Sequence, residues 1–131
     1  MLKEYVEGKV LKELPLHVME LLGRQLCKLH HINAPEYLPK QVNYGKEQFV
    51  KVENYAANSA FDLWLREKLQ YVSSFFDPDL PKALIHSDVF SDNLVISENE
   101  KSLVIMDFEE AVSYFRIFDL GMTIIGTCAE G

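Results

Sequence analysis

The 131-residue sequence lacks features that mark several common classes of protein. No apolar run approaches the roughly 20 residues of a membrane span, and the amino terminus has no apolar core of a signal peptide. Basic residues are in deficit, because 13 lysines and arginines face 20 acidic residues and the net charge is −7. That balance argues against a nucleic-acid binder. We therefore expect a cytoplasmic protein that binds neither a membrane nor a nucleic acid.

Cysteine is scarce as well. The two cysteines, Cys27 and Cys128, lie far apart and outside any metal-ligand spacing. Cys27 lies within an apolar helical pattern, so we expect it to be a small core residue. The cysteine content therefore fits a reducing compartment.

What is present is a chain about the size of one ordinary domain, with 48% hydrophobic residues and enough length to bury a core. Residues 14–32 repeat apolar side chains at helical spacing. Residues 46–76 contain no proline or glycine and predict one or two helices, with the clearest periodicity from Asn58 to Phe75. The first half of the chain is therefore expected to be helical.

The pattern changes in the second half. Residues 93–97 (NLVIS) and 102–108 (SLVIMDF) are β-branched and apolar, and the polar turn ENEK joins them. Together they predict a β-hairpin of two buried strands. Apolar character resumes in FDLGMTIIG, where we expect a helix that begins near Phe118. The order helix, helix, hairpin, helix predicts an α+β fold.

Polar side chains stand at the edges of these apolar runs. His86 and Asp88 follow ALI, Asn93 precedes LVIS, and Asp107 ends LVIM. A hairpin brings the start of one strand beside the end of the other, so we expect Asn93 and Asp107 to lie close together. Oxygen ligands that converge in this way suit Mg²⁺, and the pattern predicts a metal site. The alternative is that the Asp and Asn side chains bond nearby backbone in turns.

The whole arrangement resembles the protein-kinase signature, in which H-R-D and a later Asn precede Asp-Phe-Gly. The corresponding stretches are HSDVFSDN, residues 86–93, and MDFEEA, residues 106–111. Ser87 stands where the kinase triplet has Arg, and Glu109 replaces the Gly. These departures point to the aminoglycoside phosphotransferase and choline kinase superfamily, in which Gly is common at the position of Ser87. The sequence through FDLG looks most like the homoserine-kinase-type branch.

Other segments also resemble this superfamily. YVEGKVL, residues 5–11, resembles the hinge, and LLGRQLCKLHHI, residues 21–32, resembles the first long C-lobe helix with its Leu-x-x-Leu-His ending. The resemblance covers nearly the whole chain and is specific in residues 84–121. It implies a protein-kinase-like C-lobe, mostly helical, whose β-hairpin carries the catalytic and metal-binding loops.

The resemblance implies roles for the polar cluster. Asp88 would act as the catalytic base, or orient the hydroxyl that attacks the γ-phosphate of ATP. Asn93 and Asp107 would bind the Mg²⁺ that bridges the phosphates. ATP and Mg²⁺ are therefore the expected cofactors, with a small-molecule hydroxyl as the substrate.

Further residues would support this chemistry. His86 and Asp119 would hold the catalytic loop in place, although a direct proton transfer by His86 is the alternative. Tyr5, Val6 and Glu7 of the hinge would contact the adenine of ATP.

The remaining histidines and aromatic residues receive no chemical role. His17, His30 and His31 belong to the first helical pattern and have no partner in the sequence. We expect Trp64 and the phenylalanines and tyrosines to be core residues, although related choline enzymes use aromatic cages.

The resemblance also implies missing parts. Upstream of the hinge-like segment, residues 1–12, there is no glycine-rich loop and no strand-borne lysine. We therefore expect residues 1–131 to be a partial C-lobe without its N-lobe and C-terminal helices. Such a chain would have little or no kinase activity alone and would self-associate through its exposed apolar surface.

Three functions are compatible with the sequence. The first is ATP-dependent phosphorylation of a small-molecule hydroxyl, with homoserine, an aminoglycoside or a choline-like compound as the substrate. The second is a non-catalytic remnant or interaction module that keeps the kinase-like fold. The third is a metal-dependent hydrolase that uses His86, Asp88 and Asp107, although the D-x-x-x-x-N spacing argues against it.

Overall fold

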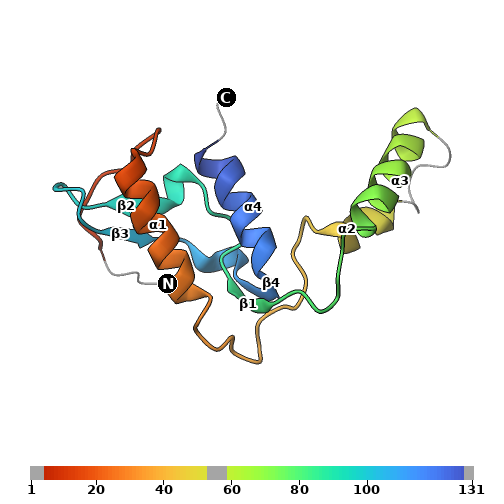
Figure 1. Ribbon diagram of the computed structural model, residues 1–131, viewed down its shortest axis with the longest axis horizontal. Helices are drawn as coiled ribbons and strands as arrows, with labels where there is room; N and C mark the ends of the chain where they lie inside the picture. The colour runs from red at the N-terminus through yellow and green to blue at the C-terminus, as the bar shows by residue number, and fades with distance from the viewer. Residues whose placement is uncertain (1–4, 53–58, 129–131) are drawn as a thin grey trace.

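The computed structural model describes residues 5–52 and 59–128 and has an α+β architecture (Figure 1). In chain order its elements are α1 (Leu16–Leu29), α2 (Lys46–Val52), α3 (Ala60–Ser73), β1 (Lys82–Ile85), the 3-10 turn η1 (Ser91–Asn93), β2 (Leu94–Ile96), β3 (Leu103–Ile105), the 3-10 turn η2 (Phe108–Glu110), β4 (Val112–Phe115) and α4 (Arg116–Thr127). In these two ranges no helix has the length and apolarity needed to cross a membrane.

Helix α1 forms the first wall of the core. Its buried side chains are spaced by three or four residues and therefore share one face: Val18, Leu22, Leu26 and Leu29. This face packs on the β2–β3 hairpin, with Leu94 and Ile96 among its partners. The helix starts after Pro15 and ends at Leu29, inside the range 14–32 that the apolar spacing predicts. Cys27 lies off the apolar face and is exposed, so the expectation that it is a core residue is wrong.

The hairpin predicted from the sequence is confirmed. Strands β2 and β3 pair in antiparallel register, with Leu94 opposite Ile105 and Ile96 opposite Leu103. Glu100 has a φ of 54° in the connecting turn, and its backbone N–H donates to the carbonyl of Ser97 at 2.8 Å. Asn93 and Met106, which adjoin Leu94 and Ile105, therefore lie at one end of the hairpin, and the turn lies at the other end.

A second antiparallel pair, β1 and β4, was not expected from the sequence. Lys82 lies opposite Phe115, and Ile85 lies opposite Val112. The two strands of this pair come before and after the β2–β3 hairpin in the sequence. A four-residue strand whose partner is so distant leaves little local signal. The chain passes directly from β4 into α4, which therefore begins at Arg116, two residues before the predicted start at Phe118.

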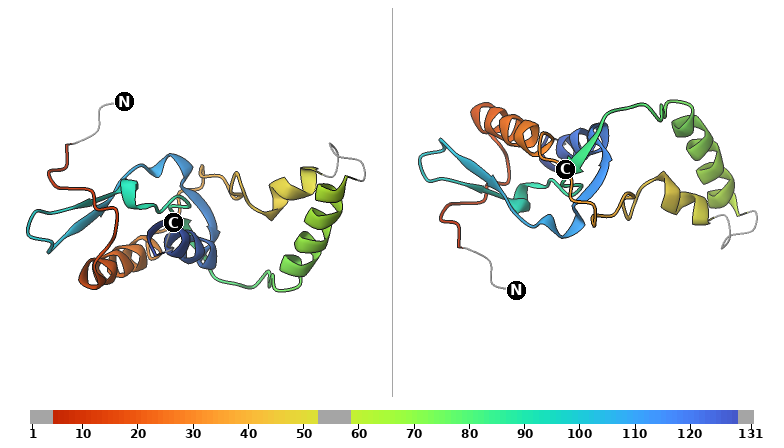
Figure 2. Two further views of the ribbon diagram at one scale, coloured as in Figure 1. Left: turned by 90° about the horizontal axis from the view of Figure 1, so that it is seen from above. Right: turned by 90° about the horizontal axis from the view of Figure 1, so that it is seen from below.

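Helices α2 and α3 contact each other and extend away from the rest of the molecule (Figures 1 and 2). The Ser59 hydroxyl caps α3 by accepting from the N–H of Asp62 at 3.1 Å, and the predicted start at Asn58 lies outside the described residues. Trp64 is 51% exposed, so the expectation that it is a core residue is wrong. The reason is that α3 buries few side chains, Leu65 among them, against the rest of the chain.

One hydrogen bond fixes α2 to the second sheet. The buried Tyr114 of β4 donates its hydroxyl to the carboxylate of Glu47 in α2, at 3.0 Å to the nearer oxygen. Burial raises the pKa of Tyr114 to about 12, and the hydrogen bond and negative charge of Glu47 act in the same direction. The neutral phenol is therefore the donor that holds α2 in place.

Candidate active site

The segment between β1 and β2 carries His86, which is fully buried. Its Nε2 donates to the carbonyl of Met106 at 2.7 Å, and its Nδ1 accepts from the backbone N–H of Asp88 at 3.3 Å. A carbonyl can only accept and a backbone N–H can only donate, so these partners select the Nε2–H tautomer. The ring also meets Phe108 edge-on, with centroids 4.7 Å apart. Both ring nitrogens are therefore occupied within the protein.

Asn93 orients the carboxylate of Asp88. The Asn93 amide nitrogen donates to the main-chain oxygen of Asp88 at 2.9 Å and to its Oδ2 at 3.0 Å. These two bonds close the turn from Asp88 to Asn93 and leave the Asp88 side chain half-buried. The carboxylate is thus held at the surface of the loop in a defined direction.

Asp107 follows β3 and lies near Asn93 at the same end of the hairpin. The N–H of Met106 donates to the carbonyl of Asn93 at 2.8 Å, which sets Asp107 next to Asn93 in the hairpin, as expected from the sequence. Asp107 has a φ of 63° and a ψ of 69°, a left-handed conformation that Asp adopts more readily than most residues. Its side chain is exposed. Asp88, Asn93 and Asp107 therefore converge at one end of the hairpin.

The donor set at this end fits a magnesium ion that a ligand helps to hold. Asn93 turns its amide nitrogen toward Asp88, so its amide oxygen is directed away from that residue. This oxygen and the Asp107 carboxylate are the two groups that would hold a cation at this end of the hairpin. Mg²⁺ is commonly bound by one or two protein oxygens, with phosphates and waters completing an octahedron. Within the described ranges, no three His, Cys, Asp or Glu side chains form a metal cage. The residues thus suit a metal shared with phosphates better than one held by protein alone.

Asp119, in the first turn of α4, holds the start of the loop that carries Asp88. Its buried carboxylate accepts from the N–H of Ser87 at 2.8 Å and from the N–H of His86 at 3.3 Å. His30 Nε2 donates to the same carboxylate at 2.8 Å. Asp119 therefore ties together the end of α1, the start of the loop and α4.

His30 is one of the residues whose role the sequence pattern does not reveal. It lies 8% exposed just beyond α1 and contacts Asp119, which is 89 positions away in the sequence. The available signal was the Leu-x-x-Leu-His ending at Leu26, Leu29 and His30. His17 also has a partner, Glu100, at 2.8 Å.

Ser87 occupies a position with unusual backbone geometry. Its φ is 66°, which explains why a glycine suits this position in the superfamily that the sequence resembles. The left-handed conformation costs a non-glycine residue about 1 kcal/mol or more. The Ser87 hydroxyl offsets part of that cost by donating to the carbonyl of Glu110 at 2.6 Å. This bond fastens the loop to η2.

Asn43 and Tyr44, from the segment before α2, face the same region and were not foreseen. Asn43 donates to the carboxylate of Glu110 at 2.8 Å. Burial raises the pKa of Tyr44, and the charges of Glu110 and Asp88 raise it further. Asn43 and Tyr44 are distant from the motif in sequence, so no local pattern marks them.

The hinge-like segment runs beside β2. The N–H of Lys9 donates to the carbonyl of Ile96 at 2.8 Å, and the N–H of Ile96 returns a bond to Lys9 at 2.9 Å. Tyr5 and Glu7 are exposed, and Val6 is half-buried. The first four residues of the predicted hinge, 1–4, lie outside the described residues.

A comparison with protein families identifies the group to which these residues belong. The sequence profile described as "Phosphotransferase enzyme family" matches residues 1–131. The chain belongs to this family. The phosphotransferase chain is also similar to a homoserine kinase of Zymomonas mobilis, with 34% identity over 66 residues that cover 50% of the chain and 20% of that protein. The resemblance noted in the sequence is thereby confirmed.

Solved structures show the same fold. A choline/ethanolamine kinase family protein from Mesorhizobium loti superposes with a TM-score of 0.66 and 20% identity, covering 93% of this phosphotransferase chain and 43% of that protein. A spectinomycin phosphotransferase in complex with ADP and spectinomycin gives a TM-score of 0.57 and 21% identity, covering 88% and 43%. The chain therefore spans less than half the length of each of these proteins.

Proposed function

We propose that this chain carries the catalytic centre of an ATP-dependent kinase that phosphorylates a small-molecule hydroxyl. The observation that carries the proposal is the convergence of Asp88, Asn93 and Asp107 at one end of the β2–β3 hairpin. A carboxylate oriented by an amide, with oxygen ligands beside it, provides what phosphoryl transfer requires. Such transfer depends mainly on positioning and charge neutralisation.

Each residue has a part in the proposed reaction. The Asp88 carboxylate orients the substrate hydroxyl and accepts its proton as the oxygen attacks the γ-phosphorus of ATP. The bond from that phosphorus to the β,γ-bridging oxygen breaks, and ADP leaves. Asn93 and Asp107 would hold Mg²⁺, which, when bound, would neutralise charge on the phosphates. Asp119 and His86 keep the loop rigid through the bonds described above. Rigidity matters because an Asp88 displaced by an ångström loses its alignment with the hydroxyl.

The comparisons support the choice of cofactor and substrate class. The spectinomycin phosphotransferase contains ADP, and the homoserine kinase takes its name from a small amino acid that carries a hydroxyl. We therefore propose a nucleoside triphosphate as the phosphate donor and a homoserine-like, aminoglycoside or choline-like alcohol as the acceptor. The similarity to homoserine kinase extends over half of the chain.

The hydrolase alternative finds less support. It needs His86 as a metal ligand, but both ring nitrogens of His86 are engaged by Met106 and Asp88. A metal ligand needs a free lone pair, and the Nδ1 lone pair already accepts a hydrogen bond. The same two contacts argue against direct proton transfer by His86.

The test is Mg²⁺-ATP binding by calorimetry, with Asp107→Ala compared with the wild type. Asp92→Ala serves as the control, because Asp92 is exposed in the same loop and outside the converging trio. We expect binding by the wild type and Asp92→Ala that Asp107→Ala abolishes. Absence of binding in a folded wild-type chain would contradict the proposal and favour a module that keeps the fold without the activity.

A further inference from the structure

The N-terminal segment is fastened to the hairpin by more than its backbone pairing. A Cβ added to Gly8 would lie 2.5 Å from the carbonyl oxygen of Ile96 and 2.7 Å from a methyl group of Val95. Real Cβ atoms do not approach other atoms so closely, so only glycine allows this contact. Gly8 thus lets Lys9 form both of its backbone bonds with Ile96.

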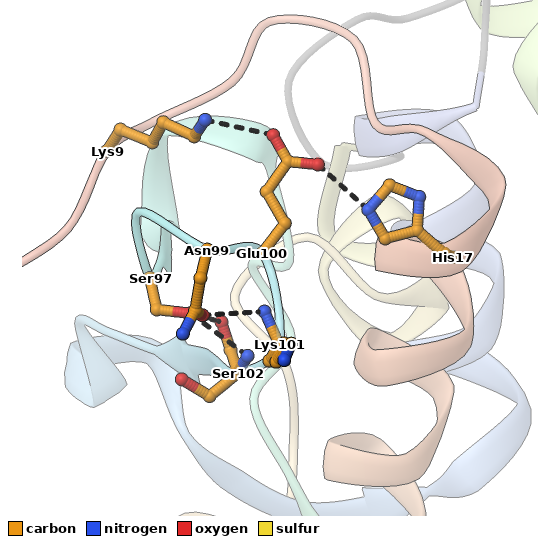
Figure 3. A network of polar contacts seen from close by, with 7 residues as sticks. All are labelled: Lys9, His17, Ser97, Asn99, Glu100, Lys101 and Ser102. Atoms are coloured by element: carbon orange, nitrogen blue, oxygen red, sulfur yellow. Dashed lines mark hydrogen bonds and ion pairs between the residues drawn. The ribbon is translucent and has the colours of Figure 1, made fainter.

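A network of side chains reinforces the same contact (Figure 3). The Lys9 ammonium lies 2.9 Å from Oε1 of Glu100, and Nε2 of His17 lies 2.8 Å from Oε2. The three residues come from the N-terminal segment, the β2–β3 turn and α1. Glu100 therefore joins three parts of the chain, and we call Lys9, Glu100 and His17 the hairpin clamp.

The charges of the clamp are mutually stabilised. The hydrogen bond from Lys9, followed by that of His17, lowers the pKa of Glu100. In return, the hydrogen bond to Glu100 raises the pKa of Lys9, and the charge of Glu98 adds to this effect. Glu100 keeps 29% of its side-chain surface exposed, so it is half-buried between Lys9 and His17. The carboxylate is thus ionised and held between its partners.

The position of the clamp suggests what it does. The β2–β3 hairpin carries Asn93 and Asp107 at one end and Glu100 at the other, and each strand has three residues. The segment that holds Tyr5, Val6 and Glu7 is fixed to this short hairpin through Lys9 and Gly8. The distance of this segment from Asn93 and Asp107 is therefore set by the hairpin and by Glu100.

We infer that Glu100 is a positioning residue for the nucleotide. It fixes the N-terminal segment relative to Asn93 and Asp107, so that one ligand reaches both at once. This inference rests on the proposed function, in which the phosphates of ATP bind at Asn93 and Asp107, and on Tyr5, Val6 and Glu7 of the hinge-like segment as the contacts of the adenine. A nucleotide depends on the clamp because it spans both parts. A bare triphosphate depends only on the metal site.

The test uses two ligands and a matched pair of variants. Glu100→Gln removes the charge that holds Lys9 and His17, and Glu98→Gln makes the same charge change at an exposed position of the same turn. Calorimetry would compare Mg²⁺-ATP with Mg²⁺-tripolyphosphate. We expect Glu100→Gln to weaken ATP binding about two- to fivefold, as fits a partly exposed ion pair, and to leave tripolyphosphate binding unchanged. Glu98→Gln should leave both affinities at the wild-type level.

Hydrogen exchange at the amides of Lys9 and Ile96 supplies a readout without nucleotide. We expect faster exchange in Glu100→Gln, and faster still in Gly8→Ala, because both loosen the backbone pairing of Lys9 with Ile96. Equal ATP affinity in wild type and Glu100→Gln would overturn the inference while the proposed function stands. If the wild type binds neither ligand, the proposed function fails, and unchanged exchange in Glu100→Gln would then overturn the clamp as well.

Discussion

Asp119 shows how much of the site depends on one buried side chain. Its carboxylate accepts three hydrogen bonds from His30, His86 and Ser87 and has no exposed surface. Burial of a carboxylate costs free energy unless hydrogen-bond donors surround it. These three bonds therefore allow Asp119 to be buried. The loop that carries Asp88 therefore begins on a fixed support.

Replacing Asp119 by Asn tests this support. The amide has one acceptor oxygen, and its NH₂ group would face a donor, so at least one N–H loses its partner. We expect the free energy of unfolding to fall by about 2–3 kcal/mol, measured by urea denaturation. Asp92→Asn, at an exposed position of the same loop, should stay within about 0.5 kcal/mol of the wild type. Equal stability of Asp119→Asn and the wild type would show that the bonds to His86 and Ser87 are dispensable.

The converging residues could be predicted because their proximity is encoded locally. Asn93 and Asp107 flank one hairpin, so the strand pattern alone sets them side by side. The contact between His30 and Asp119 has no such origin, since it forms only when α1 and α4 meet in the folded chain. Tyr44 is hidden for the same reason. Local periodicity does not report which distant segments meet.

At the scale of elements, α4 packs against the loop that carries Asp88 through a glycine. A Cβ added to Gly126 would lie 2.4 Å from the carbonyl oxygen of Val89 and 2.9 Å from the ring of Phe90. At Gly121, in the same helix, an added Cβ would meet no atom of the described residues within 4 Å. The two glycines therefore differ in role: one permits the close approach of helix and loop, and the other does not.

Alanine substitutions at these glycines should have opposite effects. Gly126→Ala forces α4 away from the loop, and we expect a loss of about 1–3 kcal/mol in the free energy of unfolding. Gly121→Ala should stabilise the chain by up to about 1 kcal/mol through its better helix propensity. Urea denaturation measures both changes. A stabilising effect of Gly126→Ala would contradict the close contact between α4 and Val89.

The elements themselves were predictable to different degrees. Helix α1 and the β2–β3 hairpin carry strong local patterns and were predicted within a few residues of their observed bounds. Strand β4 was not, because its four residues pair with β1 across the intervening hairpin. The start of α4 was predicted two residues too late, at Phe118, because the unpredicted strand β4 passes directly into the helix at Arg116.

At the scale of the whole molecule, the protruding α2–α3 pair is the least covered part. Among the described residues, four aromatic side chains on or next to α3 are more than half exposed: Phe61, Trp64, Tyr71 and Phe75. Phe61 stacks on Trp64 with centroids 5.8 Å apart, and Tyr71 meets Phe75 at 5.0 Å. An apolar stripe of this kind is unusual on a soluble monomer and favours association.

We therefore expect this chain to self-associate through α3 as its concentration rises. Trp64 is the only tryptophan, so its emission should shift to the blue as association buries it, and sedimentation velocity should show a larger species. Tyr71→Glu should weaken association by about tenfold or more, because it removes about 1.5–3 kcal/mol of apolar burial. Gln70→Glu adds the same charge at the neighbouring exposed position of α3 and should weaken it less. A monomer at every concentration, with constant Trp64 emission, would show that the aromatic stripe remains open to water.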